Sequence, residues 1–332
     1  MIARRSTCRR LILVCRRVPL ALPVLAVAAC AIAMAWTAAP SARAAEIRHR
    51  MLIGDESRAQ LLYVDQQDPS KDWVLKLPAR YRDLQLVGGG RVMMNTPDGY
   101  REYRLSDRAM IKEVKGYPGA MSARRLPDGR TVLGCAAQGV TVYELAADDK
   151  LLRKANFKAG SLRLLRLTPQ NTFLFGCNQQ VFEGDWSGKP PKTLALKEKE
   201  GAWIYQALRK PDGHLLVSAG YNPCVLELDP EGHVLKKFGG KDGAGAKELG
   251  YHFFAGFQVL ANGNLVVSNW SGHGAGDSSK GVQLIEYTPA EQIVWKWHDA
   301  SRAGSIHGII VLDDLDASVL NDDVSGVLGP VK

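Results

Sequence analysis

The feature that most constrains the fold of this chain is a hairpin pattern that recurs five times. Each copy contains an apolar segment, a turn and a second apolar segment that ends in a small or polar residue. Turns such as PDG and ANG carry the residues that tight connections between antiparallel strands require. The copies begin about 40 residues apart, rising to about 50 later in the chain, and read DLQLVGGGRVMMN, ARRLPDGRTVLGC, LLRLTPQNTFLFGC, YQALRKPDGHLLVSA and GFQVLANGNLVVSN.

Two more alternating segments around a polar turn follow several of these hairpins. The clearest are GVTVYELAADDKLLRKANF, CVLELDPEGHVLKKF and VQLIEYTPAEQIVWKW. Four strands in a unit of this length are typical of one blade of a β-propeller. Beyond residue 44 we find no helix-period segment longer than a turn or two, which argues against α/β folds. We therefore predict an all-β propeller with four-stranded antiparallel blades.

The two ends of the repeat region supply a sixth blade. Residues 51–78 contain three strands but lack the first one, and SIHGIIVLDD (305–314) resembles that missing strand. A last blade shared between the termini would close a six-bladed ring and remove exposed sheet edges. The tail beyond Leu315 has a weaker pattern and is expected either to add an edge strand or to stay loose.

The first 44 residues differ in kind from the rest and predict a signal peptide at 1–44. They hold seven arginines and no acidic residue, with an apolar stretch from Val18 to Pro40 followed by Ala42-Arg43-Ala44. A basic region, an apolar region and an A-x-A site together describe a secretory leader. Cleavage after Ala44 would leave residues 45–332 as a propeller domain that is periplasmic or secreted.

Three other interpretations of the leader stay open. The apolar stretch is long enough to remain as a membrane anchor. Val27-Ala28-Ala29-Cys30 resembles a lipoprotein box, and Arg9-Arg10 resembles a twin-arginine signal. We expect membrane association only if the leader is retained or Cys30 carries a lipid.

Charge and cysteine content exclude some classes of function. The chain holds 43 Lys and Arg against 34 Asp and Glu, and removing the seven leader arginines reduces the net charge from +9 to +2. No basic patch then favours nucleic acid. Cys135, Cys177 and Cys224 are odd in number and lack metal-ligand spacing, so we expect buried thiols.

The repeats resemble bacterial six-bladed propellers of the NHL, lactonase and quinoprotein-like repeat superfamilies. The likeness rests on the PDG turns, on the small residues that end second strands, and on QIVWKW (292–297). It is specific for fold and weak for function. The resemblance to lactonases implies a divalent cation held by carboxylate and amide oxygens, where it can polarise an ester carbonyl and activate water.

One face of the predicted ring is the natural place for a binding site. Loops between blades and loops joining second to third strands emerge there around the axis. The last complete repeat places its longest glycine-rich loop, SNWSGHGAGDSSKG, on that face. We expect five residues to approach one another there: His307, Asn269, Trp270, His273 and His252. A histidine side chain at such a place can act as a base or as a metal ligand.

Equivalent positions in other repeats add further candidates. Asp55 and Asn95 end second strands as Asn269 does, and Asp55 is expected to flank His307. The alternative is that such Asp and Asn side chains only hold turns through backbone hydrogen bonds.

Side chains near the starts of first strands complete the candidate rim. Arg82 and Arg163 could bind an anionic group in bidentate fashion, or could neutralise a nearby acidic turn. The same starts bring Tyr81, Tyr205 and Gln206 to the rim.

Two functions stay open on the sequence alone. The first is an exported, monomeric propeller that binds a small molecule, a glycan or a protein at this rim. The second is a metal-assisted hydrolase of the lactonase type, with a divalent cation as cofactor. No catalytic residue can be assigned, and no glutamate occupies an identifiable ligand position, which favours the binding protein.

Overall fold

The computed structural model describes residues 46–189, 191–197, 202–274 and 276–331. Contacts divide the chain into Met1–Ala45 and Glu46–Lys332, and all of the described residues belong to the second unit. The predicted leader and its cleavage after Ala44 lie outside the described residues. Cleavage therefore stays a prediction.

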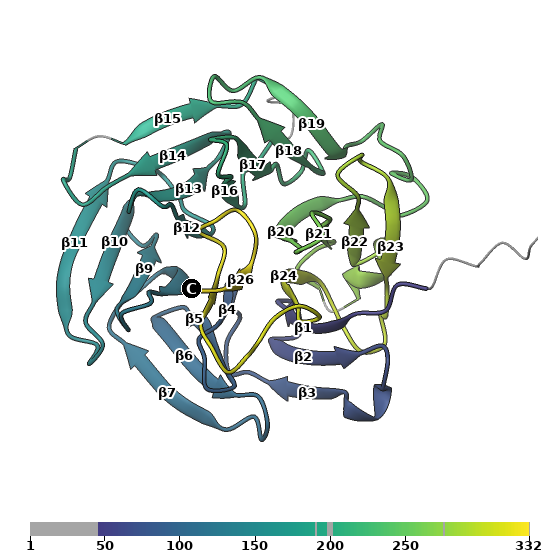
Figure 1. The fold of residues 1–332 in the computed structure, drawn as a ribbon, viewed down its shortest axis with the longest axis horizontal. Helices are drawn as coiled ribbons and strands as arrows, with labels where there is room; N and C mark the ends of the chain where they lie inside the picture. The colour runs from purple at the N-terminus through teal and green to yellow at the C-terminus, as the bar shows by residue number, and fades with distance from the viewer. Residues whose placement is uncertain (1–45, 190, 198–201, 275, 332) are drawn as a thin grey trace, which may run out of the picture. The chain divides into compact units, whose positions relative to one another are not determined.

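The second unit is a ring of six four-stranded antiparallel sheets (Figure 1), which confirms the predicted all-β, six-bladed propeller. Two short 3-10 helices, η1 (Pro69–Lys71) and η2 (Asp277–Lys280), lie in loops. Within the described ranges, no helix is long and apolar enough to cross a bilayer.

We number the blades in chain order and give their strands from the innermost outward. Blade 1 contains β24 (Ile306–Val311), β1 (Arg50–Asp55), β2 (Gln60–Asp65) and β3 (Trp73–Lys76). Blade 2 contains β4 (Leu84–Leu86), β5 (Arg91–Thr96), β6 (Gly99–Arg104) and β7 (Met110–Lys115). Blade 3 contains β8 (Ala120–Arg125), β9 (Thr131–Cys135), β10 (Val140–Leu145) and β11 (Leu151–Phe157).

The remaining three blades repeat the same order. Blade 4 contains β12 (Leu165–Leu167), β13 (Phe173–Cys177), β14 (Gln180–Gly184) and β15 (Lys192–Ala195). Blade 5 contains β16 (Ala207–Arg209), β17 (Leu215–Ser218), β18 (Cys224–Leu228) and β19 (Val234–Gly239). Blade 6 contains β20 (Phe253–Val259), β21 (Leu265–Trp270), β22 (Leu284–Tyr287) and β23 (Ile293–Trp297).

Blade 1 joins the two ends of the repeat region, as predicted. The innermost strand β24 pairs antiparallel with β1, with Ile309 opposite Ile53 and Val311 opposite Met51. The C-terminal part of the chain therefore supplies the inner strand of a sheet whose other three strands are N-terminal. This pairing closes the ring without a covalent link.

The hydrophobic core consists of separate layers between neighbouring blades. One layer packs Met51 and Ile53 of blade 1 against Trp295 and Trp297 of blade 6. Another packs Leu165 and Phe173 of blade 4 against blade 3. The predicted burial of all three cysteines is confirmed.

Glutamine side chains join innermost strands of neighbouring blades. Gln258 in β20 accepts a hydrogen bond from the Val311 N–H (2.7 Å) and donates one to the Val311 carbonyl (3.1 Å). Gln206 makes the same pair of bonds with Phe257, at 3.0 and 3.1 Å. Because buried amides are satisfied in this way, the inner strands are held at fixed spacing.

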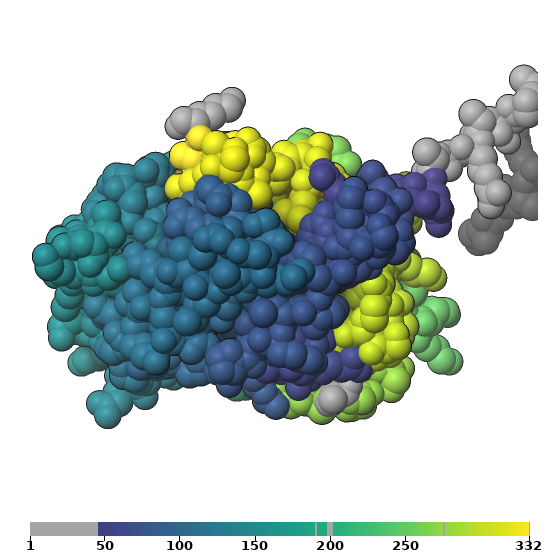
Figure 2. Space-filling view, turned by 90° about the horizontal axis from the view of Figure 1, so that it is seen from below, coloured from purple at the N-terminus to yellow at the C-terminus, as the bar shows by residue number. Residues whose placement is uncertain are grey.

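The tail after β24 crosses the centre of the ring on one face (Figures 1 and 2). Its strands β25 (Asn321–Asp322) and β26 (Gly329–Pro330) form a small hairpin. Leu320 bridges to Val87, just after β4, and the Leu328 N–H donates to the Val259 carbonyl at the end of β20. The tail thus covers the ends of innermost strands, and neither adds an edge strand to a blade nor stays loose.

A buried ion cluster fills the axis beneath the tail. Asp323 pairs with Arg124 (3.1 Å) and Arg166 (2.7 Å), and Arg166 also pairs with Asp83 (3.1 Å). Burial alone would raise the pKa of Asp323, but the two guanidinium groups hold it below its ordinary value. This end of the axis is therefore occupied by the protein's own charges.

Candidate functional site

An open cavity of about 200 Å³ lies near the starts of the innermost strands, opposite the strand ends that the tail covers. Its lining comes from every blade except blade 3, which places it at the axis of the ring. We call it the axial cavity. Nine side chains line it: Arg82, Arg163, Trp203, Tyr205, Tyr221, Phe253, Trp270, His273 and His307.

His307 lies between two aromatic rings in this cavity. Its imidazole stacks on Trp270 (centroids 5.5 Å apart, planes 10° apart) and on Tyr205 (5.1 Å, 26°). Phe253 meets both flanking rings edge-on. The imidazole is therefore fixed in orientation by packing rather than by a hydrogen-bonded carboxylate.

Among the described residues, three buried polar atoms of the lining have no close hydrogen-bond partner: His307 Nδ1, Tyr205 Oη and Arg163 Nε. The Arg82 guanidinium nevertheless lies near the Tyr205 hydroxyl and interacts with it. His307 is 3% exposed and Tyr205 is 1% exposed. Burial, together with the charges of Arg82 and Arg163, lowers the pKa of His307 well below its ordinary value. The imidazole is thus neutral near pH 7, with one ring nitrogen able to donate and the other to accept.

Tyr205 also keeps its proton. Burial raises the pKa of its hydroxyl to about 12, against the opposing charges of Arg82 and Arg163. A neutral phenol offers both a donor and an acceptor to a bound molecule.

The two arginines of the lining lack carboxylate partners. In the described ranges, no Asp or Glu lies within ion-pair distance of Arg82 or Arg163. The Arg163 guanidinium lies over the Trp203 ring, 5.8 Å from its centroid. Burial and the nearby charge of Arg82 lower the pKa of Arg163. The axial cavity therefore carries an excess of positive charge.

Glu56 is a residue of this region that the sequence did not single out. Its carboxylate is buried and accepts from Trp270 Nε1 (3.4 Å), while His273 Nδ1 lies 3.2 Å away. Arg80 pairs with the same carboxylate at 3.2 Å. Glu56 thus fixes Trp270 and His273 at the rim, and its negative charge is already paired with the positive charge of Arg80.

Of the twelve rim candidates named from the sequence, six line the axial cavity: His307, Trp270, His273, Arg82, Arg163 and Tyr205. His252 lies just outside, with its ring against Trp270 and Tyr221. Whether any of these residues binds a ligand stays a prediction.

Three further candidates are occupied by hydrogen bonds within the fold: Asn269, Asp55 and Asn95. Asn269 Oδ1 accepts from the N–H groups of His252 (2.8 Å) and Phe253 (3.3 Å), and its Nδ2 donates to two carbonyls. Asp55 accepts four hydrogen bonds, including one from the Gly304 N–H at 2.7 Å. Both side chains hold the segments that precede innermost strands, so they do not line the cavity.

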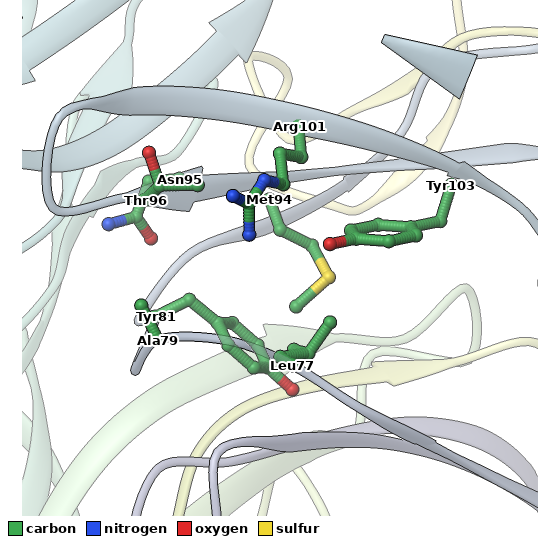
Figure 3. A pocket seen from close by; sticks show the side chains of 8 residues that line it. All are labelled: Leu77, Ala79, Tyr81, Met94, Asn95, Thr96, Arg101 and Tyr103. Carbon is green, nitrogen blue, oxygen red and sulfur yellow. The ribbon is translucent and has the colours of Figure 1, made fainter. Parts of the chain in front are cut away.

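Asn95 performs the same task in blade 2. Its Oδ1 accepts from the N–H groups of Arg82 and Asp83, both at 2.9 Å. It also borders a separate hollow of about 10 Å³ between blades 1 and 2 (Figure 3). That volume holds about one water molecule, so this hollow is no ligand site.

Strand-start residues Tyr81 and Gln206 are also structural. The Tyr81 hydroxyl donates to the Gln60 carbonyl, and Gln206 bonds the backbone of Phe257. Three aromatic lining residues were not predicted from the sequence, namely Trp203, Tyr221 and Phe253. The sequence did offer a signal for them, because each lies where the blades turn toward this face. Trp203 precedes β16, Phe253 begins β20, and Tyr221 lies in the loop between β17 and β18.

The axial cavity does not fit the divalent cation that the lactonase resemblance implies. The described residues of its lining offer no side-chain carboxylate or amide oxygen, and the Asp and Asn oxygens nearby accept hydrogen bonds from the fold. The guanidinium groups of Arg82 and Arg163, which have no carboxylate partner among the described residues, would repel a cation. Two surface groups on blade 5 turns have ligand-like spacing, but Glu227 of one already pairs with Lys210 at 2.6 Å.

Comparison with known proteins shows the fold alone. No family model matches the chain, and no curated protein matches it. A solved protein of unknown function from Bacteroides caccae is 20% identical with a TM-score of 0.67, covering 79% of this chain and 98% of that one.

Two characterised propellers are also similar in structure. A catalytically inactive variant of virginiamycin B lyase from Staphylococcus aureus is 12% identical (TM-score 0.54; 79% and 87% covered). The calcium-binding protein regucalcin from Agrobacterium tumefaciens is 12% identical (TM-score 0.50; 76% and 93% covered). The predicted resemblance to six-bladed propellers of the lactonase type is confirmed for the fold.

Proposed function

We propose that this chain binds a small molecule in the axial cavity. The observation that carries the proposal is a group of three buried atoms there that have no close hydrogen-bond partner in the part of the chain that the structure describes: His307 Nδ1, Tyr205 Oη and Arg163 Nε. A buried polar atom without a partner costs about 1–3 kcal/mol, and native structures pair nearly all such atoms. A bound molecule supplies the missing partners.

The size of the axial cavity favours a small molecule over a glycan chain or a protein. Its volume of about 200 Å³ is below the range of roughly 300–1,000 Å³ that drug-sized ligands occupy. The tail and the Asp323 ion cluster fill the other end of the axis. The ligand therefore enters from one side.

Metal-assisted hydrolysis of the lactonase type receives less support from this site. That chemistry needs a cation held by oxygen ligands, and the lining offers guanidinium, imidazole, phenol and indole groups instead. Binding therefore remains the function that the geometry favours.

A thermal-shift screen of a small-metabolite library tests the proposal. Compounds that raise the melting temperature are titrated into the wild type and into His307→Ala. We expect the variant to bind its ligand more weakly by about 1–3 kcal/mol, because a buried polar partner is lost. His214→Ala, at a blade 5 turn away from the cavity, is the matched control. Equal affinity in wild type and His307→Ala would contradict the proposal.

We propose further that binding takes place outside the cytoplasm. The support is the predicted leader, which ends at Ala44. Mass spectrometry of the protein recovered from a secreting host should give an N-terminus at Ala45. An intact leader or a lipid on Cys30 would contradict this.

A further inference from the structure

Resting on the proposed binding function, we infer that the ligand of the axial cavity is a small aryl oxyanion. Its carboxylate or phosphate group is bound by Arg82 and Arg163, and its flat apolar body lies against the aromatic walls. The charges, the walls and the polar atoms of the cavity each specify one part of this ligand.

The charges of the cavity require an anion. Arg82 and Arg163 line it without a carboxylate partner among the described residues. Their two positive charges repel each other. The carboxylates nearby are already matched, since Glu56 pairs with Arg80 and Asp83 with Arg166. An incoming oxyanion meets two guanidinium groups, whose planar donors suit carboxylate and phosphate oxygens.

The walls of the cavity require a flat apolar body. Five aromatic side chains line it, and they range from the fully buried Tyr205 to Trp203 and Tyr221, which are 37% and 44% exposed. Aromatic side chains that are partly exposed beside a cavity leave apolar ring surface in contact with water. An aryl ring placed there would gain stacking contacts and remove this surface from water.

The polar atoms of the lining argue against a neutral sugar. Saccharide hydroxyl groups need acceptors as well as donors, and Asp, Asn, Glu and Gln supply them. None of these residue types is found among the described residues that line the cavity. The neutral His307 imidazole and the Tyr205 hydroxyl can instead accept or donate one or two hydrogen bonds to a substituent of the aryl body.

Isothermal titration calorimetry with four probes tests the inference: phenylacetate, phenyl phosphate, phenylacetamide and acetate. We expect both aryl oxyanions to bind at least about tenfold more tightly than phenylacetamide, the neutral isostere, because a charge-assisted hydrogen bond exceeds a neutral one by about that factor. Acetate, which lacks the ring, should also bind at least about tenfold more weakly. The preference between phenylacetate and phenyl phosphate identifies the oxyanion.

Variants assign the effect to the two arginines. Arg82→Gln and Arg163→Gln should each weaken phenylacetate binding about tenfold and leave phenylacetamide binding unchanged. Arg108→Gln, on the exposed turn between β6 and β7, is the matched control and should bind as the wild type does. Circular dichroism confirms that each variant is folded.

The outcomes separate this inference from the function beneath it. If phenylacetamide binds as tightly as phenylacetate, or acetate as tightly as either aryl oxyanion, the inference is overturned and the binding function stands. If no probe binds while compounds from the library screen do, the inference is likewise overturned. If neither the probes nor the library bind, both proposals fail.

Discussion

At the scale of single residues, the polar side chains near the axial cavity are of two kinds. Some make all their hydrogen bonds within the fold, and others have donor or acceptor atoms left over. Asn269 and Asp55 are buried, and each makes four hydrogen bonds within the fold. His307 is equally buried, yet its Nδ1 has no hydrogen-bond partner among the residues that the structure describes. The first kind of residue holds the loops in place, and the second kind is available to a ligand.

Asn269→Ala should therefore destabilise the protein without changing the lining of the axial cavity. The substitution leaves the N–H groups of His252 and Phe253 without their acceptor, which costs about 1–3 kcal/mol. Urea unfolding followed by fluorescence measures this loss. Gln292→Ala, on an exposed turn, should change the free energy of unfolding by less than about 0.5 kcal/mol. A loss at Asn269 no larger than that of the control would show that these bonds contribute little.

The sequence could place residues on a face but could not show which of their atoms are occupied. Turn chemistry and strand alternation are local, so the ends of second strands were predictable at Asp55, Asn95 and Asn269. The partners of these side chains belong to other segments, and one sequence does not record them. In the same way, His252 and Phe253 are consecutive, yet only Phe253 lines the cavity.

At the scale of elements, the segment before β1 is fastened by one buried histidine. His49 Nδ1 lies 2.6 Å from Asp313, just after β24, and its Nε2 lies 2.9 Å from Glu286 in β22. Burial alone would lower the pKa of His49, but hydrogen bonds to the two carboxylates raise it to about 9. The charged imidazole therefore joins the first described segment to blade 6 and to the residues that follow the closing strand.

This link predicts a loss of stability in mild alkali. The folded pKa of His49 exceeds the ordinary value of 6.5, so its contribution is complete below about pH 6.5 and is lost as the pH rises through about 9. A shift of this size corresponds to about 3 kcal/mol. Urea unfolding of wild type and His49→Gln should show a gap at about pH 6 that shrinks by about pH 10. His233→Gln, at an exposed turn, is the control, and a gap that stays constant with pH would refute the link.

At the scale of the whole molecule, stability depends on closure of the ring. The main core layers lie between neighbouring blades, so every blade needs a neighbour on both sides. Closure relies on the pairing of β24 with β1 and on side chains of β24 that pack between blades, such as Ile306 and Ile309. The tail hairpin adds contacts across the axis but takes no part in this pairing.

Deleting residues 305–332 should therefore open the ring. Blade 1 would lose its innermost strand, blades 1 and 6 would expose the core layer between them, and the buried ion cluster would lose Asp323. Since whole domains are stable by only about 5–15 kcal/mol, we expect a much lower and broader melting transition by calorimetry. Deleting residues 319–332 alone is the matched control, because it removes the tail hairpin and Asp323 but leaves β24 in place. That variant should melt at a lower temperature than the full chain, yet still in one sharp transition. If the longer deletion also melted sharply and near the full-length temperature, the shared blade would not be what holds the ring together.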